Sequence, residues 1–265
     1  MSRMFSFITE RRDTYHKLPD VETLARLYFD EKLSTAQIAR MYGSSKVAVR
    51  LKLKRNGYLL RSCSEGQDLV ANHISLSSEA IEYLDGLLLG DGTITISSLG
   101  KSAAYRHTDK HKEYVRWLMK RLQRYGLEAS TPICQRGETF FFCTKWYREL
   151  VNIRYRWYPN GKKRVPKDLE LTPIVLKNWY IGDGSYRPGK KGTLKGERVL
   201  IACIKLDKNV LNKKLQEIGV KTSVYPYGFY IKSESRPRFF QYMLSDDPEI
   251  PPGYQYKFPI HYIRR

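Results

Sequence analysis

The stretches LDGLLLGDG (Leu84–Gly92) and LKNWYIGDG (Leu176–Gly184) decide the fold of this chain, because they are two copies of one apolar helix that ends in Gly-Asp-Gly. They place Asp91 and Asp183 92 residues apart. Two other motifs repeat at nearly the same interval: LQRYGL recurs as LQEIGV, and a lysine stands shortly before a proline in each half. Three motifs in register indicate an internal duplication and two similar subdomains related by a pseudo-twofold axis.

Glycines four residues apart give the first motif helix a face without side chains. Gly86 and Gly90 lie on this face, and the second copy has Asn178 and Gly182 at the same positions. We expect the two helices to pack side by side, so that both aspartates emerge at helix C-termini beside free carbonyls. In a basic protein, such paired carboxylates favour a divalent cation and metal-assisted phosphodiester hydrolysis. For one copy alone, a surface Asp-Gly turn would be the simpler interpretation.

The same order of elements is expected in both halves. A motif helix precedes two short strands, an amphipathic helix, a second strand pair and a closing helix; the second motif helix begins at the Thr172 cap and Pro173. The strands of the first half include TITISS and TFFFCT, and GFYIKS belongs to the second. The order αββαββα, present twice, predicts an α+β fold whose antiparallel strands face a ligand.

Composition points to a polyanionic partner. The 47 Lys+Arg against 27 Asp+Glu leave a net charge of +20, too large an excess for an enzyme of neutral small molecules. A hydrophobic content of 42% excludes a disordered basic tail. No apolar run reaches the roughly 18 residues of a membrane span, and the N-terminus becomes charged before a signal-peptide core forms. We therefore expect an intracellular protein, in the cytoplasm, nucleoid or an organellar matrix, that is neither secreted nor membrane-bound.

Residues 1–61 predict a separate all-α domain preceded by a flexible arm. The segment STAQIARMYGSSKVAVRLKLKRNG (residues 34–57) contains a capped helix, a turn at Gly43 and a second, basic helix. The residues expected to face its core are Ala36, Ile38, Ala39 and Met41 on the first helix and Val47, Val49 and Leu51 on the second. The pattern resembles a helix-turn-helix whose second helix enters the major groove; a helical bundle with a solvated basic face is the alternative. Residues 62–74 are interpreted as a linker. The candidate DNA contacts of this domain are Ser45, Lys46, Arg50 and Lys54.

Over about residues 78–265, the twin motifs are similar to those of LAGLIDADG homing endonucleases of the single-chain, two-motif form. The resemblance implies two αββαββα subdomains, residues 75–168 and 169–265, with saddle-shaped antiparallel sheets, in a monomer that binds a long site in double-stranded DNA. It also implies site-specific double-strand cleavage with Mg²⁺, or another divalent cation such as Mn²⁺, leaving short 3′ overhangs. The helix-turn-helix is not a standard part of that fold and would be an appended module.

The resemblance assigns functional residues by motif position. Asp91 and Asp183 match metal-binding catalytic acids, and the carbonyls of Gly90 and Gly182 lie where backbone oxygens complete the coordination. Two further candidate catalytic residues match lysines that precede a hydrophobic-Pro element: Lys163 and Lys257. For the first of these, which lies in a KKR run, plain phosphate attraction is the alternative. The second motif departs from the family pattern at Lys177 and Asn178, where small residues are usual. The strands after each motif supply candidate DNA contacts: Lys101, Tyr105, Arg106, Tyr186, Arg187, Lys190, Lys191 and Arg198.

Two other functions remain open for such a chain. A non-cleaving DNA-binding transcription regulator would have the same fold and charge, although such proteins tend to lose the acids that this chain retains at both positions. An RNA maturase that assists splicing of its own intron would also share the fold, with host intron RNA as a partner.

Overall fold

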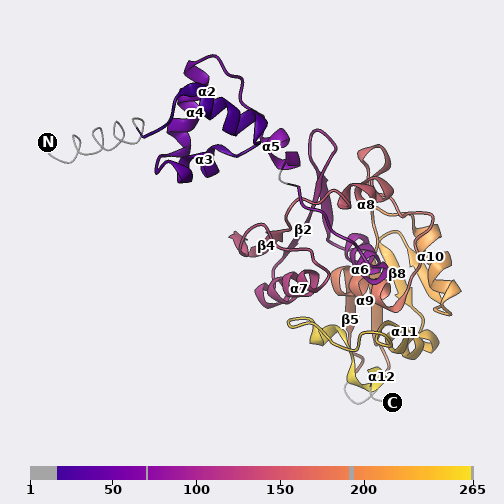
Figure 1. Cartoon of the computed structure of the whole chain (residues 1–265). Helices are drawn as coiled ribbons and strands as arrows, with labels where there is room; N and C mark the ends of the chain where they lie inside the picture. Colours follow the sequence, from indigo (N-terminus) through magenta and orange to yellow (C-terminus); the bar gives the residue numbers. More distant parts are fainter. Residues whose placement is uncertain (1–16, 70, 191–193, 264–265) are drawn as a thin grey trace, which may run out of the picture. The chain divides into compact units, whose positions relative to one another are not determined.

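A computed structural model of the chain describes residues 17–69, 71–190 and 194–263, which fall into two units (Figure 1). The first unit ends at residue 70, and the second begins at Ala71. Among the described residues, no helix has both the length and the apolar character needed to cross a membrane.

The larger unit contains the duplicated order of elements, which confirms the predicted α+β class. The elements of the first copy are α6 (Ser78–Leu89), β1 (Thr93–Ile96), β2 (Ala103–Asp109), α7 (Lys112–Arg124), β3 (Cys134–Arg136), β4 (Thr139–Cys143), α8 (Leu150–Trp157) and the 3₁₀ turn η2 (Pro159–Gly161). Those of the second copy are α9 (Pro173–Asp183), β5 (Gly184–Arg187), β6 (Arg198–Ala202), α10 (Lys208–Glu217), β7 (Thr222–Tyr225), β8 (Gly228–Ile231), η3 (Ser233–Ser235), α11 (Arg236–Met243), η4 (Gln255–Lys257) and α12 (Ile260–Ile263).

The two motif helices, α6 and α9, pack against each other at the centre of this unit (Figure 1). Each begins at a side-chain cap: the Ser77 hydroxyl accepts from the Ala80 N–H at 3.1 Å, and the Thr172 hydroxyl accepts from the Val175 N–H at 3.4 Å. Pro173 occupies the first position of α9, where no intrahelical partner is needed for its missing N–H. The predicted start of the second motif helix is therefore confirmed.

The glycine face of α6 is filled by the partner helix. A Cβ added at Gly86 would lie 2.7 Å from the Cβ of Asn178 and 2.9 Å from the Cα of Val175, closer than side chains tolerate. Asn178 fits the contact because its amide folds back and donates to the Ile174 carbonyl at 3.0 Å. Lys177 points the other way, and its ammonium contacts the Asp247 carboxylate at 2.9 Å. Both departures from the family pattern are thus accommodated without separating the helices.

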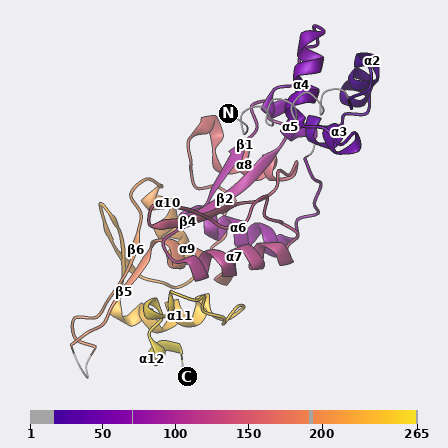
Figure 2. The same cartoon turned by 90° about the vertical axis from the view of Figure 1, so that its left-hand side faces the viewer.

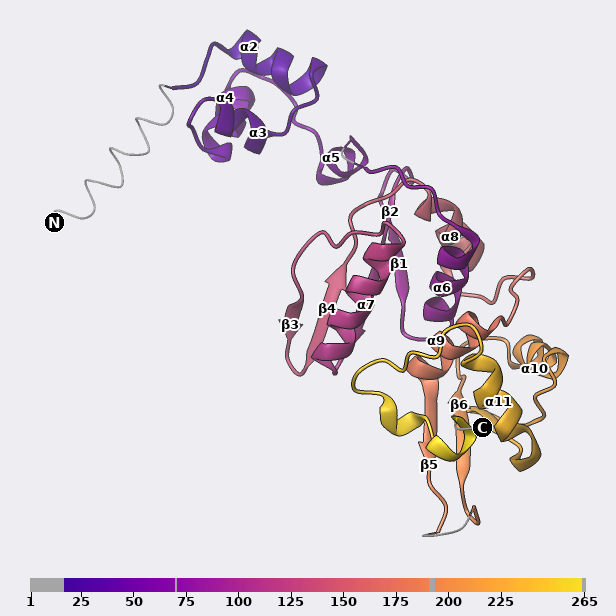
Figure 3. The same ribbon diagram turned by 60° about the horizontal axis from the view of Figure 1, so that its bottom comes forward.

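Each copy builds one four-stranded antiparallel sheet, with strand order β1-β2-β4-β3 in the first and β5-β6-β8-β7 in the second. Helix α7 packs on β2 and β4, and α8 packs on β1 and β2, so the helices lie against the core face of the first sheet (Figure 3). The strand pairs β1–β2 and β5–β6 extend away from the central helices (Figure 2). The opposite face of each sheet stays open to a ligand.

The smaller unit is a compact helical domain with its own core. It contains α2 (Val21–Ala25), the π-helix η1 (Arg26–Asp30), α3 (Thr35–Met41), α4 (Lys46–Arg55) and α5 (Cys63–Leu69). Ser34 and Gln37 form a reciprocal capping box at α3, and Ser45 caps α4 by accepting from the Ala48 N–H at 3.1 Å. Between these helices, Gly43 has a φ of +58°, which favours glycine.

Three expectations about this unit's core are wrong. Met41, Val47 and Leu51 are exposed; α4 buries Val49, as expected, together with Ala48 and Leu53. The reason is the helical period: residues 48, 49 and 53 share one face of α4, so residues 47 and 51 fall on the other.

In the segment predicted as a linker, 62–74, the structure places helix α5, and Asn72 donates its N–H to the Trp146 carbonyl at 2.8 Å.

Candidate active site

The two motif aspartates line one cavity at the C-terminal ends of α6 and α9. Asp183 is the last residue of α9, and Asp91 follows the Gly90 that ends α6. A Cβ added at Gly182 would lie 3.2 Å from the Cα of Gly90 and 3.7 Å from Asp91 Oδ2, so the two helix ends are in contact. Both carboxylates line a cavity of about 480 Å³ between the two copies.

A lysine from each copy binds the carbonyls at one motif end. Lys163 Nζ donates to the carbonyls of Gly90 and Gly92 at 3.0 and 3.1 Å. Lys257 Nζ donates to the carbonyls of Ile181 and Gly182 at 2.6 and 3.4 Å. These are carbonyls that a helix end leaves without intrahelical partners, so each lysine is held beside its aspartate by the backbone.

Burial and mutual charge shift the proton affinity of all four groups. Desolvation, followed by repulsion from Asp91, raises the pKa of Asp183 to about 7. Desolvation and the charge of Asp109 also raise the pKa of Asp91. Desolvation lowers the pKa of Lys163 and of Lys257 to about 8, against the attraction of the aspartates. Shifted pKa values of acids and lysines that lie close together are typical of a functional centre.

A third carboxylate lies on one side of the site. Asp109 is buried, accepts from the His111 N–H at 2.7 Å and also accepts from the hydroxyl of Tyr254. The ring of Tyr254 lies 4.6 Å from the ammonium of Lys257. Asp109 is also the largest attractive charge that acts on that ammonium. The second copy has no such acid, since Cys203 stands at the equivalent register position. The pairings Thr93–Arg106 and Ser185–Leu200 establish this equivalence, because Thr93 and Ser185 each follow the motif aspartate by two residues.

The donor atoms suit a hard divalent cation. The two carboxylates supply oxygen ligands, the kind that Mg²⁺ and Mn²⁺ prefer. The carbonyls of Gly90 and Gly182 accept from Lys163 and Lys257, so each would offer a cation its second lone pair. The described residues contain no cluster of three His, Cys, Asp or Glu side chains that would form an all-protein cage. A site with one or two carboxylates, which takes its other ligands from water and substrate phosphate, is typical for Mg²⁺.

Most sequence-predicted DNA contacts of the sheets are accessible. Arg187 and Arg198 pair across β5 and β6 and are both exposed, Arg106 is partly exposed over the Phe141 ring, and Lys101 is exposed in the β1–β2 loop. Lys190 is exposed beyond β5, whereas Lys191 lies outside the described residues.

Two predicted contacts need correction. Tyr105 is fully buried, and its hydroxyl contacts His107 Nδ1 at 2.9 Å. The cause is strand alternation: Arg106 faces outward on β2, so its neighbour must face the core. Tyr186 points to the same side as the core, and its hydroxyl donates to the buried Glu197 at 2.9 Å.

In the smaller unit, the four predicted contact residues are all exposed. Ser45, Lys46, Arg50 and Lys54 share the outer side of α4 with two apolar side chains, Val47 and Leu51. This face combines cations with apolar groups, which suits a helix that contacts phosphates and thymine methyl groups.

Comparison with known proteins agrees with this architecture. Residues 81–239 match the model of the LAGLIDADG DNA endonuclease family. A relative in Methanocaldococcus jannaschii, an uncharacterised protein, is 28% identical over 87% of this chain and 92% of its own length. The cytochrome b mRNA maturase bI2 of Debaryomyces hansenii is 25% identical over 75% of this chain and 80% of its own.

A solved structure has the same fold. The homing endonuclease I-WcaI bound to its DNA recognition sequence superposes with a TM-score of 0.59 at 20% identity, over 78% of this chain and 96% of that one. The family model covers more than half of the chain, and the matched range 81–239 contains Asp91, Asp183 and all of α9, with most of α6. This chain therefore belongs to the LAGLIDADG DNA endonuclease family.

Proposed function

We propose that the chain is a site-specific endonuclease that cleaves both strands of a long double-stranded DNA site with a divalent cation, as a monomer, leaving short 3′ overhangs. The observation that carries this proposal is the shared cavity of Asp91 and Asp183, with one backbone-held lysine on each side. Two equivalent sets of groups on a pseudo-twofold axis suit two antiparallel strands, one for each set.

The protein groups divide the work of hydrolysis. Asp91 and Asp183 would hold a divalent cation together with the carbonyls of Gly90 and Gly182. When bound, the cation supplies positive charge that polarises a phosphate oxygen and makes a nearby water more acidic. Lys163 and Lys257 are fixed beside the scissile phosphates, where they stabilise the negative charge that grows in the transition state.

Binding of the long site is assigned to two surfaces. The open sheet faces carry Arg106, Arg187 and Arg198 toward the DNA, and α4 of the smaller unit is proposed as an appended recognition helix. We propose the corresponding division into residues 1–61, the linker 62–74, and the subdomains 75–168 and 169–265. Cations on both surfaces favour phosphate contacts, and the sheet side chains that alternate outward favour base reading.

The test is cleavage of DNA selected without assuming a target. A randomised duplex library is first enriched for binding to the full chain and is then incubated with Mg²⁺ or Mn²⁺, and all new ends are sequenced. We expect one family of double-strand ends with short 3′ overhangs, lost with Asp91→Asn or Asp183→Asn although binding persists. Specific binding without cleavage in either metal would instead support a non-cleaving regulator.

A maturase is the second candidate, and the relative from Debaryomyces hansenii, a cytochrome b mRNA maturase, favours it. The same fold and charge would serve RNA binding. A maturase acts on the intron that encodes it, so the test is to establish whether such an intron surrounds the coding sequence and to measure its splicing with and without purified protein. Acceleration of splicing by the Asp91→Asn variant would show that splicing and cleavage use different groups.

A further inference from the structure

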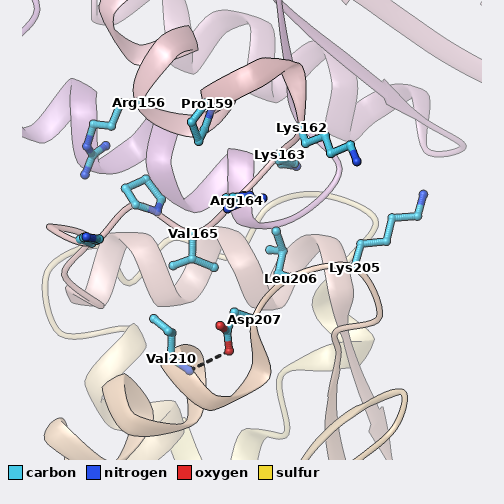
Figure 4. A pocket seen from close by; sticks show the side chains of 12 residues that line it. Arg156, Pro159, Lys162, Lys163, Arg164, Val165, Lys205, Leu206, Asp207 and Val210 are labelled. Carbon is cyan, nitrogen blue, oxygen red and sulfur yellow. Dashed lines mark hydrogen bonds between the residues drawn. The ribbon is translucent and has the colours of Figure 1, made fainter.

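A second cavity opens beside the site, between the segment that follows α8 and the start of α10 (Figure 4). It has a volume of about 740 Å³. Six of its lining residues are cations: Arg156, Lys162, Lys163, Arg164, Lys167 and Lys205. Asp207 is the one carboxylate among the lining residues, and its Oδ1 is occupied by the N–H groups of Asn209 and Val210 at the start of α10.

Two of these cations already have partners. Arg156 binds the carboxylate of Asp85 at 2.7 Å and that of Asp168 at 2.8 Å. Lys163 is held by the carbonyls at the first motif. The side chains of the other four are exposed and have no hydrogen-bond or ion-pair partner among the described residues: Lys162, Arg164, Lys167 and Lys205. We call these four residues and the cavity they line the phosphate cleft.

The phosphate cleft is continuous with the cavity of the two aspartates. Lys163, Lys205 and Leu206 line both. Lys162 and Lys205 extend toward the same side in Figure 4. A strand whose phosphate lies at the aspartates can therefore continue into the cleft, where Val165 and Leu206 provide apolar surface for its sugars.

Three of these four cations are not repeated in the described segment around Lys257, although Lys110 lies near Lys257 as Lys205 lies near Lys163. When the two active-site lysines are aligned, Lys162 corresponds to Tyr256 and Arg164 to Phe258. Lys167 corresponds to His261, whose ring contacts the buried Glu197 at 3.0 Å. The two sides of the cut thus meet surfaces of different charge, although the catalytic groups are duplicated.

We propose that the phosphate cleft binds the sugar-phosphate backbone of the DNA target on one side of the cut, and that the protein consequently retains one product half more tightly than the other. This inference rests on the proposed function for the placement of the scissile phosphates. The chemistry is general: each phosphate neutralised by a cation releases condensed counterions, so affinity falls steeply with salt.

The test compares the affinity of the full chain for the two halves of its target, supplied as separate duplexes that divide the selected site at its centre. The target is defined by binding selection, so no cleavage is required. The triple variant Lys162→Ala/Arg164→Ala/Lys167→Ala removes three cleft cations. Its matched control removes the same charge from α7, in Arg116→Ala/Lys120→Ala/Arg124→Ala, where all three side chains are exposed.

We expect the cleft variant to lose at least tenfold affinity for one half duplex and less than twofold for the other. For the affected half, the slope of log K against log salt should flatten by about two to three units, since each lost phosphate contact removes about 0.9. The control variant should bind both halves as the unmodified chain does.

An RNA of the same length is measured in parallel with the two half duplexes. Three outcomes would overturn the proposal: equal losses of affinity for both halves, no loss for either half, or a loss of affinity for the RNA alone. Each is distinguishable from failure of the proposed function, which would appear as intact target DNA in Mg²⁺ and Mn²⁺. The half-duplex affinities remain informative in that case because they do not depend on cleavage.

Discussion

The hydroxyl of Tyr254 donates a hydrogen bond to Asp109, which joins the segment before Lys257 in the second copy to a buried carboxylate of the first. The Tyr254 ring also lies under the Lys257 ammonium, so a single side chain connects this lysine to a third acid. Lys163 has no such connection, because the register equivalent of Asp109 is Cys203. The two half-sites therefore differ in the groups that position their lysines.

We predict that Tyr254→Phe slows cleavage of one strand only. The ring under Lys257 is kept, while the hydrogen bond that orients Asp109 is lost, so the strand served by Lys257 should be cut several-fold more slowly. A duplex labelled separately on each strand measures this as a nicked intermediate of one polarity. Cys203→Ser, at the register position that corresponds to Asp109 in the other copy, serves as control and should leave both rates unchanged. Equal slowing of both strands would contradict a positioning role.

Replacement of the active-site lysines should affect rate more than affinity. Lys163→Met or Lys257→Met removes the charge that faces the scissile phosphate, and we expect single-turnover cleavage at saturating protein to fall more than tenfold. Lys162→Met provides the contrast, because its ammonium is exposed in the phosphate cleft and should change affinity and salt dependence instead. If Lys163→Met flattened the salt slope without changing the saturated rate, simple phosphate attraction would explain this residue.

The raised pKa of Asp183 predicts a pH-dependent stability. Because the folded state holds this proton up to a pKa of about 7, whereas the unfolded chain releases it near 3.8, the free energy of unfolding falls as pH rises from about 4 to about 7. Asp183→Asn has no ionisable group at this position, so the fall in the free energy of unfolding between pH 4 and pH 7 should be smaller in this variant. With EDTA present, the Tm of the variant should exceed that of the unmodified chain at pH 8 by more than it does at pH 4.

Asp168→Asn is the matched control with the opposite sign. Its hydrogen bond to Arg156 lowers the pKa of Asp168, so the carboxylate stabilises the fold at high pH and this variant should lose Tm at pH 8. Added Mg²⁺ should raise the Tm of the unmodified chain at pH 8 and leave Asp183→Asn nearly unchanged. A Tm difference for Asp183→Asn that is identical at pH 4 and pH 8 would show that this carboxylate is not destabilised by burial.

Close packing of the motif helices predicts a graded cost for added methyl groups. Gly86→Ala would place Cβ 2.7 Å from the Val175 carbonyl oxygen and should destabilise the larger unit by about 1–3 kcal/mol. Gly90→Ala meets its nearest atom, the Gly182 Cα, at 3.4 Å, an ordinary contact, and should cost less. Urea denaturation followed by circular dichroism measures both. Equal costs would mean that the helices can separate without penalty.

The internal duplication was enough to predict the αββαββα order and the pairing of the two motif helices. Contacts between residues far apart in the sequence could not be predicted from it. Register between the copies predicted that Asp91 and Asp183 would lie together, and the structure places both in one cavity with Lys163. Lys257 lies behind it, buried against the carbonyls of Ile181 and Gly182, and the catalytic roles of all four residues stay predictions.

The prediction that Tyr105 and Arg106 both contact DNA is wrong for Tyr105, because adjacent residues of a strand face opposite sides of the sheet. No sequence pattern placed Asp109 near the site, because its link to the site is a hydrogen bond from Tyr254, 145 residues later in the chain. Two of the cleft cations, Lys162 and Arg164, belong to the KKR run of the sequence. Lys205 is distant in sequence, and its place in the same cavity is evident only from the structure.

The last prediction concerns Arg50 on the exposed face of α4. If this arginine reads a base edge, Arg50→Lys should weaken binding about as much as Arg50→Ala, because an ammonium cannot reproduce the bidentate pair of a guanidinium with guanine. If Arg50 contacts only phosphate, Arg50→Lys should retain most of the affinity, and Arg50→Ala should flatten the salt slope by about one unit. Both substitutions are made in the full chain and measured on the selected target by footprinting and by affinity against salt. In either case cleavage at saturating protein should continue at the unmodified rate, since every proposed catalytic group lies in the larger unit. A footprint and affinity unchanged by both substitutions would remove α4 from the DNA interface.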